Sequence, residues 1–148
     1  MSYATNEDLT DYMPDALEHG VADWSAELVL AESDVQRDIK VRWFIPEFGT
    51  GKNFRGSVSL EQYDITKLTA TQWTRATVYR AMYQYILPKL STFRPEGDSF
   101  RERIDFYRSS YAEEMNAQLS SGVEYDFDND GTVESGEVWA TQQNRLYR

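Results

Sequence analysis

The sequence predicts a mainly α-helical fold: a small bundle of about three to four helices with a long central loop and an extended C-terminal arm. Apolar side chains recur at three- and four-residue spacing in three long segments, and helix-capping residues, glycines and prolines bound these segments. The chain has 148 residues, of which 41% are hydrophobic, so it is long and apolar enough to form a core. We expect a helical domain over residues 1–122, followed by an acidic loop and arm over residues 123–148.

The first third of the chain predicts one short and one long helix. Thr5 and Asp8 have the spacing of a capping box, and Pro14 ends the short helix that they begin. A longer helix follows Asp23 and extends to about Trp43. Its apolar side is formed by Trp24, Leu28, Ala31, Val35 and Ile39.

Residues 44–68 predict a long loop, because Pro46 and three glycines interrupt the helical pattern there. Lys52, Phe54 and Arg55 lie at the centre of this segment. Long loops in compact domains often bind something, so we expect these three residues to contact a partner. The alternative is a flexible surface loop without a binding role.

Two more helices are predicted in the second half. Residues 69–72 have capping-box spacing, and the helix after them ends or kinks at Pro88. Its apolar side is formed by Trp73, Ala76, Tyr79, Tyr83, Ile86 and Leu90. Residues 99–102 match the S-x-x-E capping box, and Gly122 is placed as the C-terminal cap of the last helix. The apolar side of that helix is formed by Phe100, Ile104, Tyr107, Tyr111, Met115 and Leu119.

The net charge of -10 is unevenly distributed. Residues 1–36 hold nine acidic side chains and no Lys or Arg, residues 37–108 carry a net charge of +5, and residues 109–148 carry -6. Such segregation favours contact between complementary surfaces, and the overall acidity disfavours tight binding of DNA. The absence of Cys and the single His leave no set of nucleophile, base and orienting group, so we expect no enzyme. No apolar run approaches the roughly 18 residues of a membrane span, and we expect no membrane association.

The most specific motif extends from Asp126 to Glu137 and fits the calcium-loop pattern D-x-[DN]-x-[DN]-G-x5-E at every specified position. Calcium takes about six to eight oxygen ligands. The pattern assigns these to the side chains of Asp126, Asp128 and Asp130, the backbone carbonyl of Thr132, Glu134 through water, and Glu137 as a bidentate ligand. The chain has no second loop of this kind, and Gly122 interrupts an incoming helix. The alternative is an acidic turn whose Asp side chains cap their own backbone. No cofactor is required, and calcium is the one candidate.

Several stretches together resemble the head-tail connector, or head-completion adaptor, proteins of tailed bacteriophages. These stretches are residues 3–9 (YATNEDL), the acidic second helix ending in residues 39–42 (IKVR), the helix over residues 76–90, and residues 100–111 running into 122–126 (GVEYD). They cover most of the chain, but none of them is a catalytic signature. The calcium-loop pattern is not a general property of the family and belongs to this sequence.

The resemblance implies a virion protein at the head-tail interface, assembled in the host cytoplasm. Such proteins form a ring, typically of about twelve copies, that binds the portal protein, supports neck or tail proteins and lets DNA pass without specific binding. An extended C-terminal arm often holds the portal, which assigns docking to residues 138–148. The side chains of this arm best suited to docking are Trp139, Arg145, Leu146, Tyr147 and Arg148. The alternative from another class is a calcium-binding protein whose single loop acts as a partner-binding module.

Overall fold

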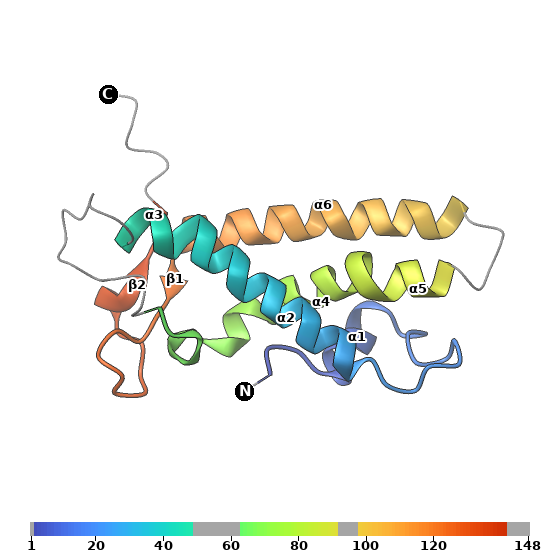
Figure 1. Ribbon diagram of the computed structural model, residues 1–148, viewed down its shortest axis with the longest axis horizontal. Coiled ribbons are helices and arrows are strands. Elements are labelled where there is room, and N and C mark those ends of the chain that lie inside the picture. Colours follow the sequence, from blue (N-terminus) through green and yellow to red (C-terminus); the bar gives the residue numbers. More distant parts are fainter. Residues whose placement is uncertain (1, 49–62, 92–97, 142–148) are drawn as a thin grey trace, which may run out of the picture. The chain divides into compact units, whose positions relative to one another are not determined.

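The computed structural model describes residues 2–48, 63–91 and 98–141 (Figure 1). The prediction of a mainly α-helical fold is confirmed. The α-helices are α1 (Asn6–Tyr12), α2 (Ser25–Ile39), α3 (Ile45–Phe48), α4 (Thr74–Ala81), α5 (Leu87–Ser91) and α6 (Asp98–Ser121). Two short strands, β1 (Val123–Glu124) and β2 (Val138–Trp139), form an antiparallel pair near the C-terminus. No helix in the described ranges is both long and apolar enough to cross a membrane.

The chain divides into two compact units, each built from segments that are distant in the sequence. Unit 1 comprises residues 1–35 and 70–115, and unit 2 comprises residues 36–69 and 116–148. The chain passes from one unit to the other within α2 and within α6. The predicted division at residue 122 into a helical domain and an arm stays a prediction.

Unit 1 has a mainly aliphatic core. Its buried cluster takes side chains from α1, α2, α4, α5 and the beginning of α6, and includes Leu9, Leu28, Val78, Ile86, Leu87 and Phe100. Trp24 is also buried there and donates a hydrogen bond from its indole Nε1 to the Ala16 carbonyl, 2.8 Å away. Of the two predicted helical stripes, Trp24, Leu28, Ala31, Ile86 and Leu90 lie in this cluster, whereas Tyr79 is only half-buried.

Buried charge accompanies the aliphatic core of unit 1. The Arg80 guanidinium lies 3.0 Å from the Asp34 carboxylate, which also accepts a 2.7 Å hydrogen bond from the Tyr85 hydroxyl. Burial is the largest single influence on the Arg80 guanidinium and lowers its pKa, but the hydrogen bond to Asp34 and the charge interactions with Tyr83, Asp34 and Tyr111 together outweigh burial and raise the pKa. Arg80 also lies over the rings of Tyr83 and Tyr111. Together these contacts satisfy a charge that would be costly to bury alone.

Unit 2 has a mainly aromatic core. Its rings come from the segment before residue 49, from Tyr63 and from the hairpin, and they are Trp43, Phe44, Phe48, Tyr63, Tyr125, Phe127 and Trp139. Tyr125 is central, with its ring 4.8 Å from Phe127 and 5.6 Å from Trp43 between centroids. Burial raises the pKa of the Tyr125 hydroxyl, which accepts a hydrogen bond from the Asp64 backbone N–H.

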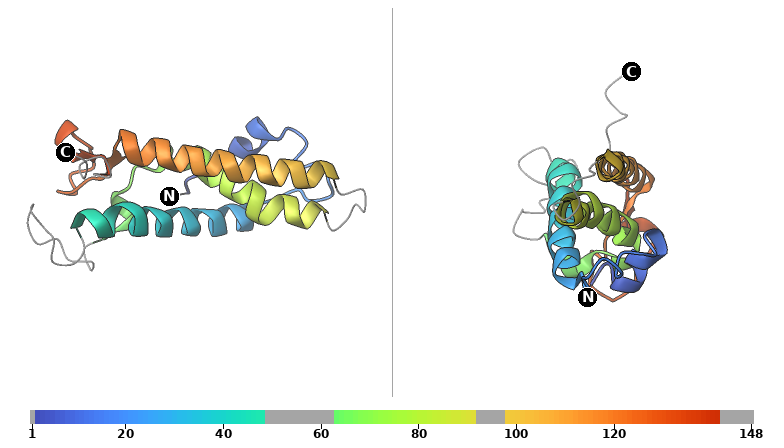
Figure 2. Two further views of the ribbon diagram at one scale, coloured as in Figure 1. Left: turned by 90° about the horizontal axis from the view of Figure 1, so that it is seen from above. Right: turned by 90° about the vertical axis from the view of Figure 1, so that its right-hand side faces the viewer.

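The prediction that the second helix ends near Trp43 is wrong, as is the start of the loop at residue 44, because the helical run continues to Phe48. A π turn, Lys40–Phe44, joins α2 to α3, and a second π turn, Met82–Ile86, joins α4 to α5 (Figure 2). In each case a proline follows two residues after the π turn. A proline lacks the N–H for an α-helical bond and its ring clashes with the carbonyl four residues before it. The wider turn accommodates Pro46 and Pro88, and both helical runs continue.

The helix boundaries predicted at Thr5 and at Gly122 are confirmed, whereas the capping box predicted at residues 69–72 is wrong. Those residues lead into a 3-10 helix, Ala70–Trp73, and α4 begins at Thr74 without a side-chain cap. Thr5 and Asp8 form the capping box of α1, which ends at Tyr12 before Pro14. Gly122 has φ +127° at the end of α6 and donates its N–H to the Gln118 carbonyl, as predicted for a C-terminal cap. α6 begins at Asp98, slightly before the predicted cap at residue 99. Residues 49–62 of the predicted loop lie outside the described residues, whereas residues 65–67 form a 3-10 helix.

Candidate functional site

The acidic loop is the candidate site, and a short β-ribbon closes its base. In the antiparallel pairing, Val123 lies opposite Trp139 and Glu124 opposite Val138. Gly122 makes this close approach possible, because a Cβ atom there would lie 2.6 Å from Cγ1 of Val138. The loop between the strands is therefore held at both ends within unit 2.

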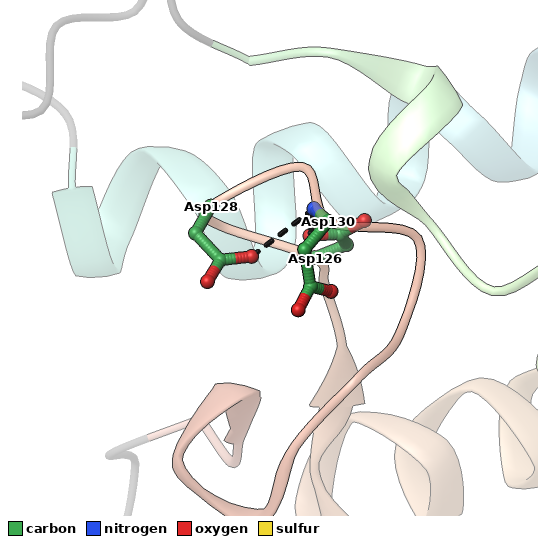
Figure 3. Close-up of side chains that lie close together, drawn as sticks. All are labelled: Asp126, Asp128 and Asp130. Atoms are coloured by element: carbon green, nitrogen blue, oxygen red, sulfur yellow. Dashed lines mark hydrogen bonds between the residues drawn. The ribbon is translucent and has the colours of Figure 1, made fainter.

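Three of the six predicted ligands lie together. The carboxylates of Asp126, Asp128 and Asp130 each offer an oxygen within 4.8 Å of the others (Figure 3). Asp126 is buried, with 9% of its surface exposed, while Asp128 and Asp130 face solvent. Three carboxylates at this separation repel one another, and a cation between them would remove that repulsion.

Backbone N–H groups orient the three carboxylates. Asp126 accepts hydrogen bonds from the N–H of Asp130 at 3.2 Å and of Gly131 at 2.9 Å, one on each carboxylate oxygen. Asp128 accepts a second contact from the Asp130 N–H at 3.2 Å, which is the dashed line in Figure 3. The tight turn requires positive φ at Asn129 (62°) and Gly131 (90°). Each Asp126 oxygen keeps lone-pair capacity for a cation.

The Asp130 carboxylate is held in its charged form. The Thr132 hydroxyl donates to it at 2.7 Å and the Thr132 N–H at 2.8 Å. These two hydrogen bonds, the hydroxyl contributing most, lower the pKa of Asp130 below its ordinary value of 3.8. The carboxylate is therefore fully ionised at neutral pH.

Glu137 and Glu134 do not join the three aspartates. Glu137 instead accepts hydrogen bonds from the N–H groups of Phe127 at 2.8 Å, Asp128 at 3.4 Å and Glu134 at 3.0 Å. In this arrangement Glu137 closes the loop by capping its backbone, as the acidic-turn alternative expects. To act as a bidentate ligand, Glu137 would have to exchange these bonds for the cation. Thr132 and Glu134 are exposed to solvent.

The loop is connected to the aromatic core of unit 2, a feature that the sequence analysis did not predict. The Phe127 ring lies 5.4 Å from Phe48 and 5.1 Å from Trp139 between centroids. Lys67 donates from its ammonium to the Phe127 carbonyl at 2.9 Å, and Asp126 donates its N–H to the Lys67 carbonyl at 2.9 Å. The alternation of aromatic and acidic residues at positions 125–128 is the sequence signal that would have indicated this connection between the loop and the aromatic core.

Trp139 is the one predicted partner-binding residue within the described part of the chain. It is half-buried, packs against Phe48 with ring centroids 5.0 Å apart, and donates its Nε1–H to the Gly136 carbonyl. Its contacts give Trp139 a structural role in closing the hairpin. The other predicted partner-binding residues, Lys52, Phe54, Arg55, Arg145, Leu146, Tyr147 and Arg148, lie outside the described residues.

The fold and the site together define a mainly helical protein with an acidic loop whose motif is that of calcium loops. No family model, curated protein or solved structure matches this chain.

Proposed function

We propose that this chain is a structural component of a phage particle, a head-tail connector that forms a ring under the portal and links the capsid to the tail or neck. The segregation of charge along the chain is the main support. A ring of identical subunits joins two different surfaces of each subunit, and an acidic and a basic surface complement one another. The proposal gives the protein no catalytic role.

The acidic side chains of residues 1–36 divide into two groups that fit this proposal. Glu27 pairs with Lys89 and Asp34 with Arg80, while Glu32 accepts the N–H of Tyr3. These three acids serve the fold of unit 1. Asp8, Asp15 and Asp23 likewise bind groups of unit 1, at Thr5, His19 and Ser25. Glu7, Asp11 and Glu18 are exposed, and they are suited to meeting a basic surface or to repelling DNA phosphates in a channel.

The connector proposal is tested by mixing the chain with the portal protein of the same phage and imaging the product by electron microscopy. We expect the isolated chain to be monomeric and a ring to form when portal is present. The C-terminal arm is best removed after Thr141, because deleting residues 138–148 would also remove β2 and Trp139. Loss of portal binding with an unchanged circular dichroism spectrum is the expected result. If the truncated chain still assembled on portal, the docking role of the arm would be wrong.

A second proposal concerns calcium, and the cluster of Asp126, Asp128 and Asp130 supports it. We propose that the acidic loop binds one calcium ion and that the bound loop serves as a partner-binding module. Titration calorimetry with calcium is the direct measurement, with magnesium as the comparison. Binding would raise the free energy of unfolding by about 2.7 kcal/mol at a hundredfold excess over Kd.

The matched variants separate binding from folding. Asp126→Ala with Glu137→Gln should abolish the heat of binding, and Glu137→Gln alone retains one acceptor oxygen for the loop N–H groups while losing the charge. Glu7→Gln changes an exposed acid of unit 1 by the same chemistry and should have no effect on binding. Absence of heat at millimolar calcium would dismiss this proposal and leave the acidic turn as a purely structural element.

A further inference from the structure

Unit 1 carries an open groove of about 500 Å³ on its surface. One wall is the turn after α1, residues 12–15, and the other is formed by Glu102, Arg103, Phe106 and Tyr107 of α6. All of these residues belong to unit 1. The groove is therefore a property of that unit by itself.

The groove has an aromatic wall with one ring exposed to solvent. Phe106 is 63% exposed although its ring lies 5.2 Å from that of Tyr107. Tyr107 lies 5.9 Å from Tyr79, which lies 5.4 Å from Tyr12, and this series of ring contacts makes the wall rigid. An exposed phenylalanine beside a hollow on a rigid surface is typical of a site where another apolar side chain binds.

The charges of the groove select the kind of side chains that would bind beside the ring. Asp15 and Glu102 carry negative charge and Arg103 positive charge, so the lining is net negative. The wall at residues 12–15 also belongs to the stretch that holds no Lys or Arg before Arg37, and His19 in that stretch contacts the Asp15 carboxylate at 3.1 Å. A complementary segment would carry an aromatic residue with a cation on each side.

The chain contains such a segment, Lys52-Asn53-Phe54-Arg55, and residues 48–60 around it contain no acidic side chain. We infer that the groove of unit 1 receives Phe54 of a second copy, with Lys52 and Arg55 meeting Asp15 and Glu102. This contact joins unlike surfaces, so it generates a ring or a filament rather than a closed pair. The inference rests on the proposed ring and adds which surface meets which segment.

Photo-crosslinking tests this contact with the full-length chain. The photoreactive amino acid p-benzoylphenylalanine replaces Phe54, and equal amounts of isotopically heavy and light protein are mixed with the portal protein and irradiated. We expect heavy–light crosslinks that map to residues 12–15 or 102–107. Crosslinks within one copy, or to any other region, would overturn the inference.

Substitutions in the groove test its chemistry. Phe106→Ala should lower the crosslink yield about tenfold, as expected for the loss of a central aromatic contact. Val29→Ala, at a position on α2 that is 57% exposed, is the matched control and should leave the yield unchanged. Asp15→Lys with Glu102→Lys should also lower the yield, and adding Lys52→Glu with Arg55→Glu should restore it. A charge swap that restores nothing would show that these pairs do not meet.

The C-terminal segment, Arg145–Arg148, also combines cations with apolar side chains. A fluorescent peptide of residues 141–148 is therefore compared with one of residues 50–57 in anisotropy measurements on the intact chain. Tighter binding of the C-terminal peptide to the groove, lost in Phe106→Ala, would overturn the assignment to Lys52–Arg55. Portal binding of the same variants is measured separately. If rings form on portal but this crosslink is absent, the contact between Phe54 and the groove is refuted and the connector proposal is not. If the crosslink forms but the chain does not bind portal, the connector proposal is refuted and the contact is not.

Discussion

Unit 1 has a core mainly of aliphatic side chains on α-helices and one π turn, Met82–Ile86, whereas the core of unit 2 consists largely of aromatic rings. The rings of unit 2 come from a π turn, a short helix, residue 63 and a hairpin. Unit 1 additionally buries the ion pair of Asp34 and Arg80, whereas in unit 2 the acidic side chains of the loop bind backbone N–H groups. Regular helices produce a periodic sequence signal, and rings gathered from irregular segments do not.

Substitution of a core tryptophan in each unit is expected to lower the free energy of unfolding most. Trp24→Ala in unit 1 and Trp43→Ala in unit 2 each remove a fully buried indole, and each should lower the free energy of unfolding by about 3–5 kcal/mol. Chemical denaturation measures the loss, and hydrogen exchange detected by mass spectrometry locates it. Exchange should rise most in the unit that carries the substitution. An equal rise in both units for either variant would break the comparison.

Removing one partner of the buried ion pair is next in size. Asp34→Ala leaves Arg80, whose side chain is 17% exposed, without its carboxylate, and should cost about 2–3 kcal/mol. Glu27→Ala is the control, because its partner Lys89 is 56% exposed and such pairs contribute about 1 kcal/mol or less. Thermal unfolding of the two variants side by side is sufficient. If the two variants lost equal stability, the buried ion pair would not contribute more to the stability of unit 1 than the exposed pair does.

The junction of α6 with the hairpin tests unit 2 at one backbone position. Gly122→Ala places a Cβ atom against Val138 at a positive φ, and should lower stability by about 1–3 kcal/mol. At Gly136 nothing lies within 4 Å of an added Cβ atom, so Gly136→Ala should change little. Urea denaturation followed by tryptophan fluorescence measures both. A silent Gly122→Ala would mean that the hairpin is not held against the end of α6.

The smallest effect is a pH dependence in the acidic loop. The hydrogen bonds from Thr132 lower the pKa of Asp130 in the folded chain below 3.8. Their contribution to the free energy of unfolding is therefore complete above about pH 4, and it is lost as the pH falls through the pKa of the folded chain. NMR titration of the carboxyl carbon should give a midpoint below 3.8, and Thr132→Val should raise it. An unchanged midpoint in that variant would remove Thr132 as the cause.

The sequence was informative wherever one local interaction decides the backbone. The capping box of Thr5 and Asp8, the end of α1 before Pro14 and the left-handed Gly122 all depend on neighbouring residues and were predicted correctly. The spacing of Asp126, Asp128 and Asp130 likewise predicted that their carboxylates would lie together. Short-range hydrogen bonding explains all of these successes.

The predictions that were wrong or missing involve contacts between distant segments. Pro46 predicts a loop from the sequence, yet the packing of Phe44 and Phe48 accompanies a helix that continues past it. The contact of Phe127 with Phe48 joins residues far apart in the sequence, and no local pattern announces it. Glu137 fits a ligand position by spacing, but its carboxylate is bound to backbone N–H groups of the loop, which spacing alone does not reveal.

The two π turns amount to single-residue insertions into otherwise regular helices. In a regular α-helix an extra residue would rotate everything after it by about 100° around the helix axis, whereas the wider π turn absorbs the extra residue. In the first run, the buried series passes from Ile39 through Trp43 and Phe44 to Phe48, and Pro46 faces solvent. Deletion of the exposed Val41 would convert the π turn into an α turn and place Phe44 and Phe48 four and eight residues after Ile39, so they would stay on the buried side. We expect evolutionary changes of length at this turn to occur together with replacement of Pro46.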